Sequence, residues 1–110
     1  MLRAQIINYE KAMDLGLEGK ITIEDLSVLD AIRYYRSHPK RVQLQMGELE
    51  YDLITANILM DLLPFTIHDP SEIPAIEKRL EDAGLIRIFK AEDGRVFIST
   101  TEKADELYFS

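Results

Sequence analysis

The sequence predicts an α+β fold formed by one domain that spans residues 1–110. Segments with apolar residues three or four positions apart, typical of helices, alternate with segments of strict apolar–polar alternation, typical of strands. A length of 110 residues is enough to bury one core and leaves little room for a second. No internal repeat, low-complexity stretch or linker divides the sequence.

The N-terminal part predicts a long helix after an ambiguous start. Residues 1–9 are compatible with a helical face or with a short strand, and a helix is expected over residues 10–15. The long helix is expected over about residues 22–37, because Thr22 can cap it and its first turn is acidic. Pro39 ends it. The side chains expected on its buried face are Leu26, Val28, Leu29, Ile32 and Tyr35.

Two β-hairpins are predicted, one in the middle of the chain and one near its end. Residues 42–46 and 49–53 both alternate, and a Gly-Glu pair joins them. Residues 85–89 and 96–100 flank a loop with an Asp-Gly pair, which is good turn chemistry. The acids of the first hairpin, Glu48, Glu50 and Asp52, share one face of their strand and could bind a cation, but a polar outer face is the favoured expectation.

Two helices are predicted between the hairpins, and Thr101 is placed to cap a last one over residues 102–108. The first covers residues 56–63. The second runs to about residue 83 and is capped by Asp69 or Ser71; Pro74 fits best with Ser71 as the cap. Gly84 is placed to end that helix. Their inward side chains are expected to be Ile58, Leu59, Leu62, Leu63, Ile73, Ile76, Leu80 and Ala83.

The composition argues against several classes of protein. Without cysteine there is neither a disulfide framework nor thiol chemistry. No apolar run is long enough to span a bilayer, and the N-terminus lacks the apolar core of a secretion signal, so we expect a cytoplasmic protein without a membrane partner. His38 and His68 have no partner at metal-ligand spacing, and no motif for a nucleophile or a phosphate cradle occurs. We therefore expect no enzyme, no metal and no cofactor.

The charge is unevenly distributed along the chain. The formal net charge is -7, from 20 acidic and 13 basic residues, which argues against a surface that is basic throughout. One basic patch precedes the first hairpin: Arg33, Arg36, Lys40 and Arg41. Residues 42–77 then contain acids but neither lysine nor arginine, and bases return from Lys78 onward. An anionic partner is expected to meet these two basic stretches.

The segment IPAIEKRLEDAGLIRIFKAEDGRVFISTTEKADELY, residues 73–108, resembles the region around the recognition helix and wing of MarR-like regulators. The residues that match the pattern are Leu80, Gly84, Leu85, Ile86, Asp93, Arg95 and Thr100. Upstream, GELEYDLITANILMDLLPF, residues 47–65, is similar to the winged-helix domains of phage and plasmid replication initiators. The resemblance covers about half of the chain well and its first forty residues only loosely.

The resemblance implies a winged helix-turn-helix with a C-terminal wing hairpin and an additional β-hairpin before the helix-turn-helix. It implies a DNA-binding protein, either a small transcriptional regulator or a replication-associated protein of phage or plasmid type. The helix near residues 71–82 would enter the major groove of double-stranded DNA, and the wing would rest on the backbone. The residues expected to contact DNA are Ser71, Ala75, Lys78, Arg79, Lys90 and Arg95, with the basic patch at residues 33–41 as a second contact.

An alternative explanation of the same residues is structural. Lys78 and Arg79 are spaced to pair with Glu81 and Asp82, and Asp93 can pair with Arg95. The alternative function is then a winged-helix module for protein–protein interaction, with the acidic residues 42–77 as its docking face. A homodimer is compatible with both functions, but the last helix is expected to end too soon for the long dimerisation helices of MarR-like proteins.

Overall fold

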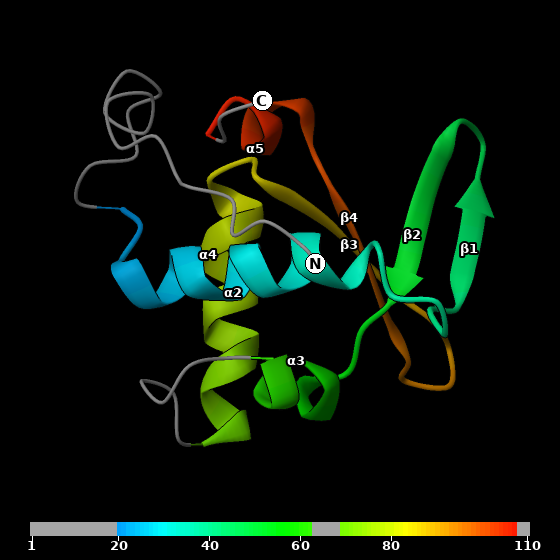
Figure 1. Cartoon of the computed structure of the whole chain (residues 1–110), viewed down its shortest axis with the longest axis horizontal. Helices are drawn as coiled ribbons and strands as arrows, with labels where there is room; N and C mark the ends of the chain where they lie inside the picture. Colours follow the sequence, from blue (N-terminus) through cyan, green and yellow to red (C-terminus); the bar gives the residue numbers. More distant parts are fainter. Residues whose placement is uncertain (1–19, 63–68, 108–110) are drawn as a thin grey trace.

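The computed structural model describes residues 20–62 and 69–107, and the helix expected over residues 10–15 lies outside them. Within the described residues the fold is α+β, with four α-helices and a four-stranded antiparallel sheet (Figure 1). The elements follow in the order α2 (Ile23–Tyr35), β1 (Gln43–Met46), β2 (Leu49–Leu53), α3 (Ala56–Leu62), the 3-10 turn η1 (Pro70–Glu72), α4 (Ile73–Asp82), β3 (Ile86–Lys90), β4 (Val96–Thr100) and α5 (Glu102–Asp105).

The sheet has the strand order β1-β2-β4-β3, and its two hairpins are joined through β2 and β4. β3 and β4 pair along their whole length, but β2 pairs with β4 only at Asp52↔Ile98 and Leu53↔Phe97. The hairpin of β1 and β2 therefore projects from the body of the molecule (Figure 1). Gly47 has φ 64 at the first position of its two-residue turn, and a glycine there is characteristic of a type II′ hairpin turn.

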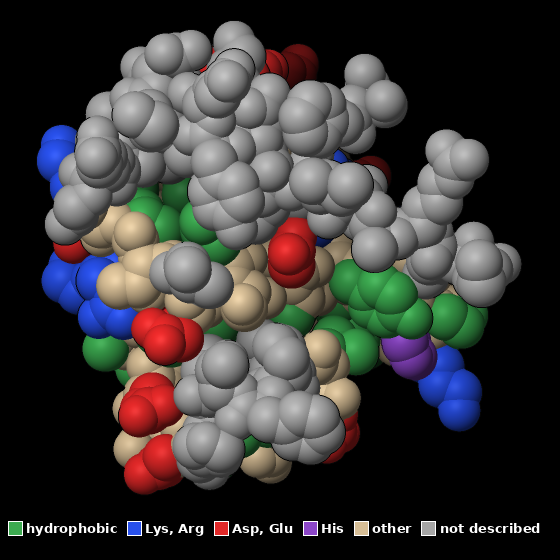
Figure 2. Space-filling model, turned by 60° about the vertical axis from the view of Figure 1, so that its left-hand side comes forward, with side chains coloured by type: hydrophobic (Ala, Val, Ile, Leu, Met, Phe, Trp, Pro, Cys, Tyr) green, Lys and Arg blue, Asp and Glu red, His purple; other side chains and the backbone are tan. Residues whose placement is uncertain are grey.

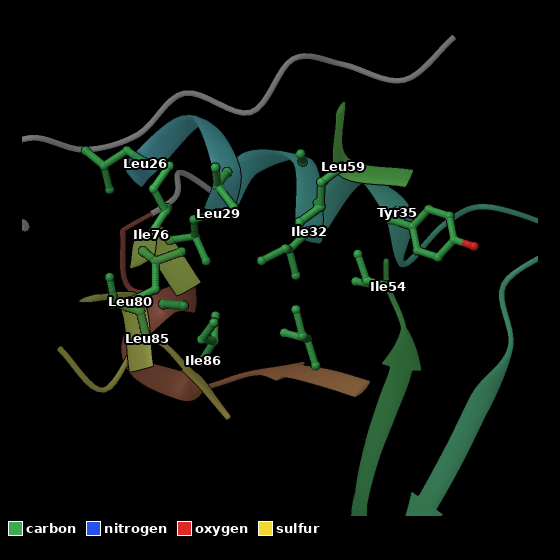
Figure 3. Close-up of a cluster of buried hydrophobic side chains, with 14 of the residues drawn as sticks. Leu26, Leu29, Ile32, Tyr35, Ile54, Leu59, Ile76, Leu80, Leu85 and Ile86 are labelled. Carbon is green, nitrogen blue, oxygen red and sulfur yellow. The ribbon is translucent and has the colours of Figure 1, made fainter. Parts of the chain in front are cut away.

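The helix predicted over residues 22–37 is confirmed as α2. Thr22 caps it: the Thr22 side chain accepts from the Asp25 N–H, and the Asp25 side chain accepts from the Thr22 N–H, forming a capping box. The buried face of α2 packs on α4, β3 and β4 (Figure 3). The fully buried side chains at the centre of this core include Leu29, Ile32, Ile54, Leu59, Ile73, Leu80, Leu85 and Ile98.

The start of α4 differs from both predicted caps. The Asp69 side chain accepts from the Ser71 N–H at 2.9 Å and caps η1, not α4. Glu72 stands at the N-cap of α4 without a side-chain cap, and Pro74 occupies the first turn, where its missing N–H costs no helical hydrogen bond. The predicted inward residues Ile73, Ile76 and Leu80 are buried, whereas Leu63 lies outside the described residues.

The exit from α4 is held by Gly84. Its φ of 78 belongs to the left-handed region that favours glycine. The Leu85 N–H donates to the Leu80 carbonyl and the Gly84 N–H to the Glu81 carbonyl, the two bonds of a Schellman motif. The chain then enters β3 at Ile86, one residue later than predicted, while β4 has its predicted bounds. Thr101 caps α5 as predicted, but this helix ends at Asp105.

The two faces of the sheet have different neighbours. Ile86 and Ile98 belong to the core under the helices, whereas the rings of Phe89 and Phe97 lie 6.3 Å apart on the opposite face, away from the helices. Asp52 pairs directly with Ile98, so it lies on the helix side of the sheet and is only 5% exposed. The prediction that Asp52 belongs to a polar outer face is wrong, because β2 crosses from the exposed hairpin into the sheet at this residue.

Candidate nucleic-acid interface

Three of the predicted DNA contacts lie on η1 and on the side of α4 opposite its buried face. Ser71, Ala75 and Lys78 are exposed, while Ile76 and Leu80 turn toward the core. Lys78 donates to Asp82 at 3.4 Å, one turn further along the helix, as predicted from the spacing. Both side chains are exposed, and an ion pair of this kind contributes little to stability and opens readily.

Arg79 is held by another element. Its Nε donates to Asp25 Oδ2 at 2.9 Å and its NH2 to Asp25 Oδ1 at 2.8 Å, so the guanidinium clamps the first turn of α2. The predicted pairing of Arg79 with Glu81 or Asp82 is wrong. Asp25 is fully buried and is bonded both to Thr22 and to Arg79. Arg79 therefore contributes to the fold, and its side chain is 44% exposed, against 73% for Lys78.

The Asp25 carboxylate is stabilised in its charged form. Burial by itself would raise the pKa of Asp25, but the hydrogen bond from Arg79, the backbone hydrogen bond from Thr22 and the charge of Arg79 outweigh burial and hold it below its usual value. A buried charge that is both paired and hydrogen-bonded avoids the large cost of an isolated one. The contact therefore fixes how α2 lies across α4.

The loop between β3 and β4, residues 91–95, carries the predicted wing contacts. Lys90 and Arg95 are exposed at its two ends. Arg95 Nε donates to Asp93 Oδ2 at 2.7 Å, and the Arg95 guanidinium carbon lies 5.5 Å from the centroid of the Phe97 ring. The carboxylate of Asp93 and the ring face together hold this guanidinium in place.

The second basic patch does not form one continuous exposed surface. Arg33 pairs with Asp105 of α5, and Arg36 donates to Thr100 Oγ1 at 2.8 Å, at the end of β4. Arg41 donates to the Arg36 carbonyl, and its Nε lies 4.0 Å from Asp52 Oδ1. Lys40 is exposed and makes no side-chain ion pair within the described part of the chain. Three of the four cations thus tie α2 and its following loop to the sheet and to α5.

Acidic side chains surround the predicted contacts on α4. Asp69, Glu72, Glu81 and Asp82 are exposed on η1 and α4, where Lys78 and Arg79 are the basic residues. In Figure 2, Lys and Arg side chains gather at the left margin and again at the lower right beside the histidine, and Asp and Glu side chains gather at the lower left and occur singly elsewhere. Burial raises the pKa of Glu77 to about 7, so this acid is only partly charged at neutral pH.

Sequence reasoning missed the partners of Asp25 and Arg87, although it expected Arg87 to flank Arg95 at the wing. Asp25 was recognised as a helix-start acid but not as the partner of Arg79, which lies 54 positions away. Arg87 donates to the Thr100 carbonyl at 3.2 Å and lies beside the Arg36 contact, which no local pattern indicates. The cationic type of Arg87 and its strand position were visible in the sequence. Its neighbours were not, because they come from the opposite strand and from α2.

The chain matches no protein-family model, and neither a curated protein nor a solved structure is significantly similar to it. Among the described residues, no group of three or more histidine or acidic side chains is placed to hold a metal ion. No helix over residues 20–62 and 69–107 has the length and apolar character needed to cross a membrane.

Proposed function

We propose that this chain is a winged-helix domain that binds double-stranded DNA, in the manner of a small transcriptional regulator or a replication-associated protein. α4 would be the recognition helix and the β3–β4 hairpin the wing. The order helix, strand, two helices and hairpin supports this proposal, as does the pairing of β2 with β4 beside the hairpin. The additional strand β1 extends the sheet at the end away from the wing.

The observation that carries the proposal is the exposure of cations on both α4 and the β3–β4 hairpin. The N-terminal end of α4 and the 91–95 loop both extend toward the lower part of the view in Figure 1, and Lys78 lies in the middle of α4. Lys78 on α4 and Lys90 and Arg95 on the hairpin are exposed, and the ion pairs of Lys78 and Arg95 are solvent-accessible. A phosphate oxygen can replace a carboxylate in such a pair at little cost.

The arrangement favours phosphate contacts over reading of base edges. Three exposed cations supply a modest electrostatic footprint, and the neighbouring acids of α4 oppose a close approach of phosphates. Ser71 and Ala75 are the exposed small residues that would face the groove, and a hydroxyl and a methyl group discriminate bases weakly. The proposal therefore predicts weak binding that depends strongly on salt.

Fluorescence anisotropy with a labelled random-sequence duplex of about 25 base pairs, titrated between about 25 and 200 mM NaCl, tests this proposal. Three phosphate contacts predict a slope of about -3 for log K against log salt concentration. Arg95→Ala and Lys78→Ala should each weaken binding and reduce the magnitude of this slope by about 1. Lys20→Ala removes the same charge outside the interface and is the matched control.

Two results would contradict DNA binding. One is the absence of binding at the lowest salt concentration. The other is an equal loss of affinity in Lys20→Ala, Lys78→Ala and Arg95→Ala, which would indicate a response to net charge without a defined interface.

A second candidate function is a protein-docking module, and the acid excess on η1 and α4 favours it. Exposed Asp69, Glu72, Glu81 and Asp82 would suit a basic partner. A partner held by this face would lose affinity on replacement of Glu72 or Glu81 by glutamine, whereas DNA affinity would increase with the same replacements. The opposite signs separate the two functions.

A further inference from the structure

The β1–β2 hairpin presents an open strand edge. Among the described residues, β1 lies at one margin of the sheet and pairs with β2 alone. The Val42 carbonyl accepts from the Leu53 N–H at 2.8 Å, so these two residues form a hydrogen-bonded pair. Hydrogen-bonded and non-hydrogen-bonded pairs then alternate along the two strands. The backbone groups of Leu44 and Met46 therefore point toward β2, and those of Gln43 and Gln45 point outward.

The residues of this edge lack the features that usually keep sheet edges apart. β1 consists of Gln43, Leu44, Gln45 and Met46, with no charged residue and no proline. Natural proteins commonly protect an exposed edge with lysine, proline or a bulge. A neutral edge whose outward N–H and C=O groups are regularly spaced is a template for another strand.

One face of the same hairpin is apolar and open to solvent. Val42, Met46 and Leu49 are 50%, 39% and 38% exposed, and they are three of the four large hydrophobic side chains in the described residues with high exposure. Val42 and Met46 share a face with Leu44, because side chains alternate along a strand. Isolated exposed apolar residues are ordinary, but three on one hairpin face form a patch.

We propose that two copies of this chain associate by antiparallel pairing of their β1 strands about a two-fold axis. The register that uses both outward residues pairs Gln43 of one copy with Gln45 of the second copy. Leu44 then lies opposite Leu44 on the axis, and Val42 lies opposite Met46. The exposed apolar residues of each edge are thereby covered by those of the other, and the two sheets become continuous.

The charges that flank β1 are complementary in this register. Lys40 of one copy lies opposite Glu48 of the second, on both sides of the axis. Within the described residues neither side chain takes part in a salt bridge. The edge thus carries a cation before the strand and an anion after it, and this polarity matches an antiparallel copy of itself and opposes a parallel one.

Cysteine cross-linking tests the register, since the chain has no cysteine of its own. Leu44→Cys places two thiols at a non-hydrogen-bonded pair, where Cα atoms approach to about 4.5 Å and a disulfide can form. Val42→Cys is the matched control on the same strand and face, because the two copies of residue 42 lie about 13 Å apart in this register. Under mild oxidation Leu44→Cys should form a covalent dimer and Val42→Cys should stay monomeric on a non-reducing gel.

Charge reversal with analytical ultracentrifugation gives an independent test that leaves the backbone unchanged. Lys40→Glu and Glu48→Lys should each weaken the dimer by roughly tenfold, because both symmetry-related pairs become repulsive. The double variant Lys40→Glu/Glu48→Lys should restore the dimer. Tyr34→Gln, which removes the remaining exposed large hydrophobic residue from α2, should leave it unchanged. Circular dichroism checks that each variant is folded.

Three outcomes would overturn the proposal. The first is a wild-type protein that sediments as a monomer up to about 300 μM, since its dissociation constant would then be well above about 1 mM. The second is equal cross-linking of Leu44→Cys and Val42→Cys, which indicates random collision. The third is a dimer that none of the hairpin variants weakens. None of these measurements involves DNA, so their outcome is independent of the proposed function.

Discussion

Glu77 is a carboxylate in the middle of α4 that is given neither a hydrogen bond nor an ion pair by the described residues. Burial alone raises its pKa to about 7. Asp52 shows the same effect, since burial raises its pKa although the charges of Arg41 and Arg36 oppose the change. The Oδ1 atom of Asp52 is buried without a hydrogen bond, and Arg41 lies too far away to satisfy it fully. Both acids therefore reduce the stability of the fold when they are charged.

Replacement of Glu77 by glutamine should stabilise the protein above neutral pH and leave it unchanged in acid. The folded state holds the Glu77 proton more tightly than the unfolded chain, so the free energy of unfolding falls as the pH rises from 4.5 to about 7. Glu77→Gln removes this loss, and we expect a gain of about 1–2 kcal/mol at pH 8. Urea unfolding followed by circular dichroism at pH 4 and pH 8 measures the difference. Glu81→Gln on the exposed side is the control, and an equal gain at both pH values would contradict the expectation.

At the scale of elements, charged side chains decide how the helices meet. The Asp25–Arg79 pair joins the first turn of α2 to the last turn of α4. The apolar core also packs these two helices together, but apolar contacts are less directional than this pair. Thr101 serves the same, C-terminal end of α4: its Oγ1 donates to the Gly84 carbonyl at 2.6 Å and also accepts from the Ala104 N–H, so one residue joins the helix exit to α5. Lys103 adds a bond to the Ala83 carbonyl at 2.7 Å.

Removal of Arg79 should destabilise the fold far more than removal of its neighbour Lys78. Arg79→Ala leaves the buried Asp25 charge with its cap alone, and we expect a loss of about 2–3 kcal/mol at pH 7, below the cost for a fully buried pair because the Arg79 side chain is 44% exposed. Lys78→Ala should change the free energy of unfolding by less than about 0.5 kcal/mol. Since the pKa of Asp25 is lowered, the stability that it contributes is present above about pH 4 and is lost as the pH falls through its folded-state value. Equal losses in the two variants in urea unfolding would argue against this role.

At the scale of the whole molecule, the acid excess is a property of the surface. The net charge of -7 opposes compaction through self-repulsion. The salt bridges within the described residues involve the acids Asp25, Asp52, Asp82, Asp93 and Asp105. We therefore expect salt to have opposite effects on the stability of the fold and on binding of phosphates. It screens repulsion within the fold, and it weakens any contact with phosphates.

Thermal unfolding in increasing salt should show this stabilisation directly. We expect the unfolding midpoint to rise by about 2–5 °C between about 20 and 500 mM NaCl, because repulsion among the acids is screened more than the partly buried Asp25–Arg79 pair. Lys20→Gln makes the net charge more negative by one, so the unfolding midpoint should rise more steeply with salt concentration. A midpoint that falls with salt would mean that ion pairs, and not repulsion, dominate the surface.

Local sequence patterns predicted the positions of helices and strands well but did not predict the partners of the charged side chains. Strict alternation located β2, the Asp-Gly turn located the hairpin that contains β4, and the combination of Thr22 and the acids after it located the start of α2. These signals concern backbone geometry and burial within a few residues. The cap of α4 was misplaced because Asp69 and Ser71 offer the same chemistry two positions apart, and the intervening 3-10 turn depends on Pro70 and on the packing of Ile73.

The sequence by itself determined the order of helices and strands, the caps at Thr22, Gly84 and Thr101, and the set of residues that fill the core, because periodicity and turn chemistry act over short distances along the chain. The tertiary structure decided which charges are available to a partner. Arg79 is 44% exposed but is held in a pair with Asp25, Arg33 and Arg36 contact Asp105 and Thr100, and Lys78, Lys90 and Arg95 are exposed. Among the described residues, it also left the outer edge of β1 without a partner strand. Pairing of charges and exposure of an edge depend on distances between segments far apart in sequence, which only the folded chain fixes.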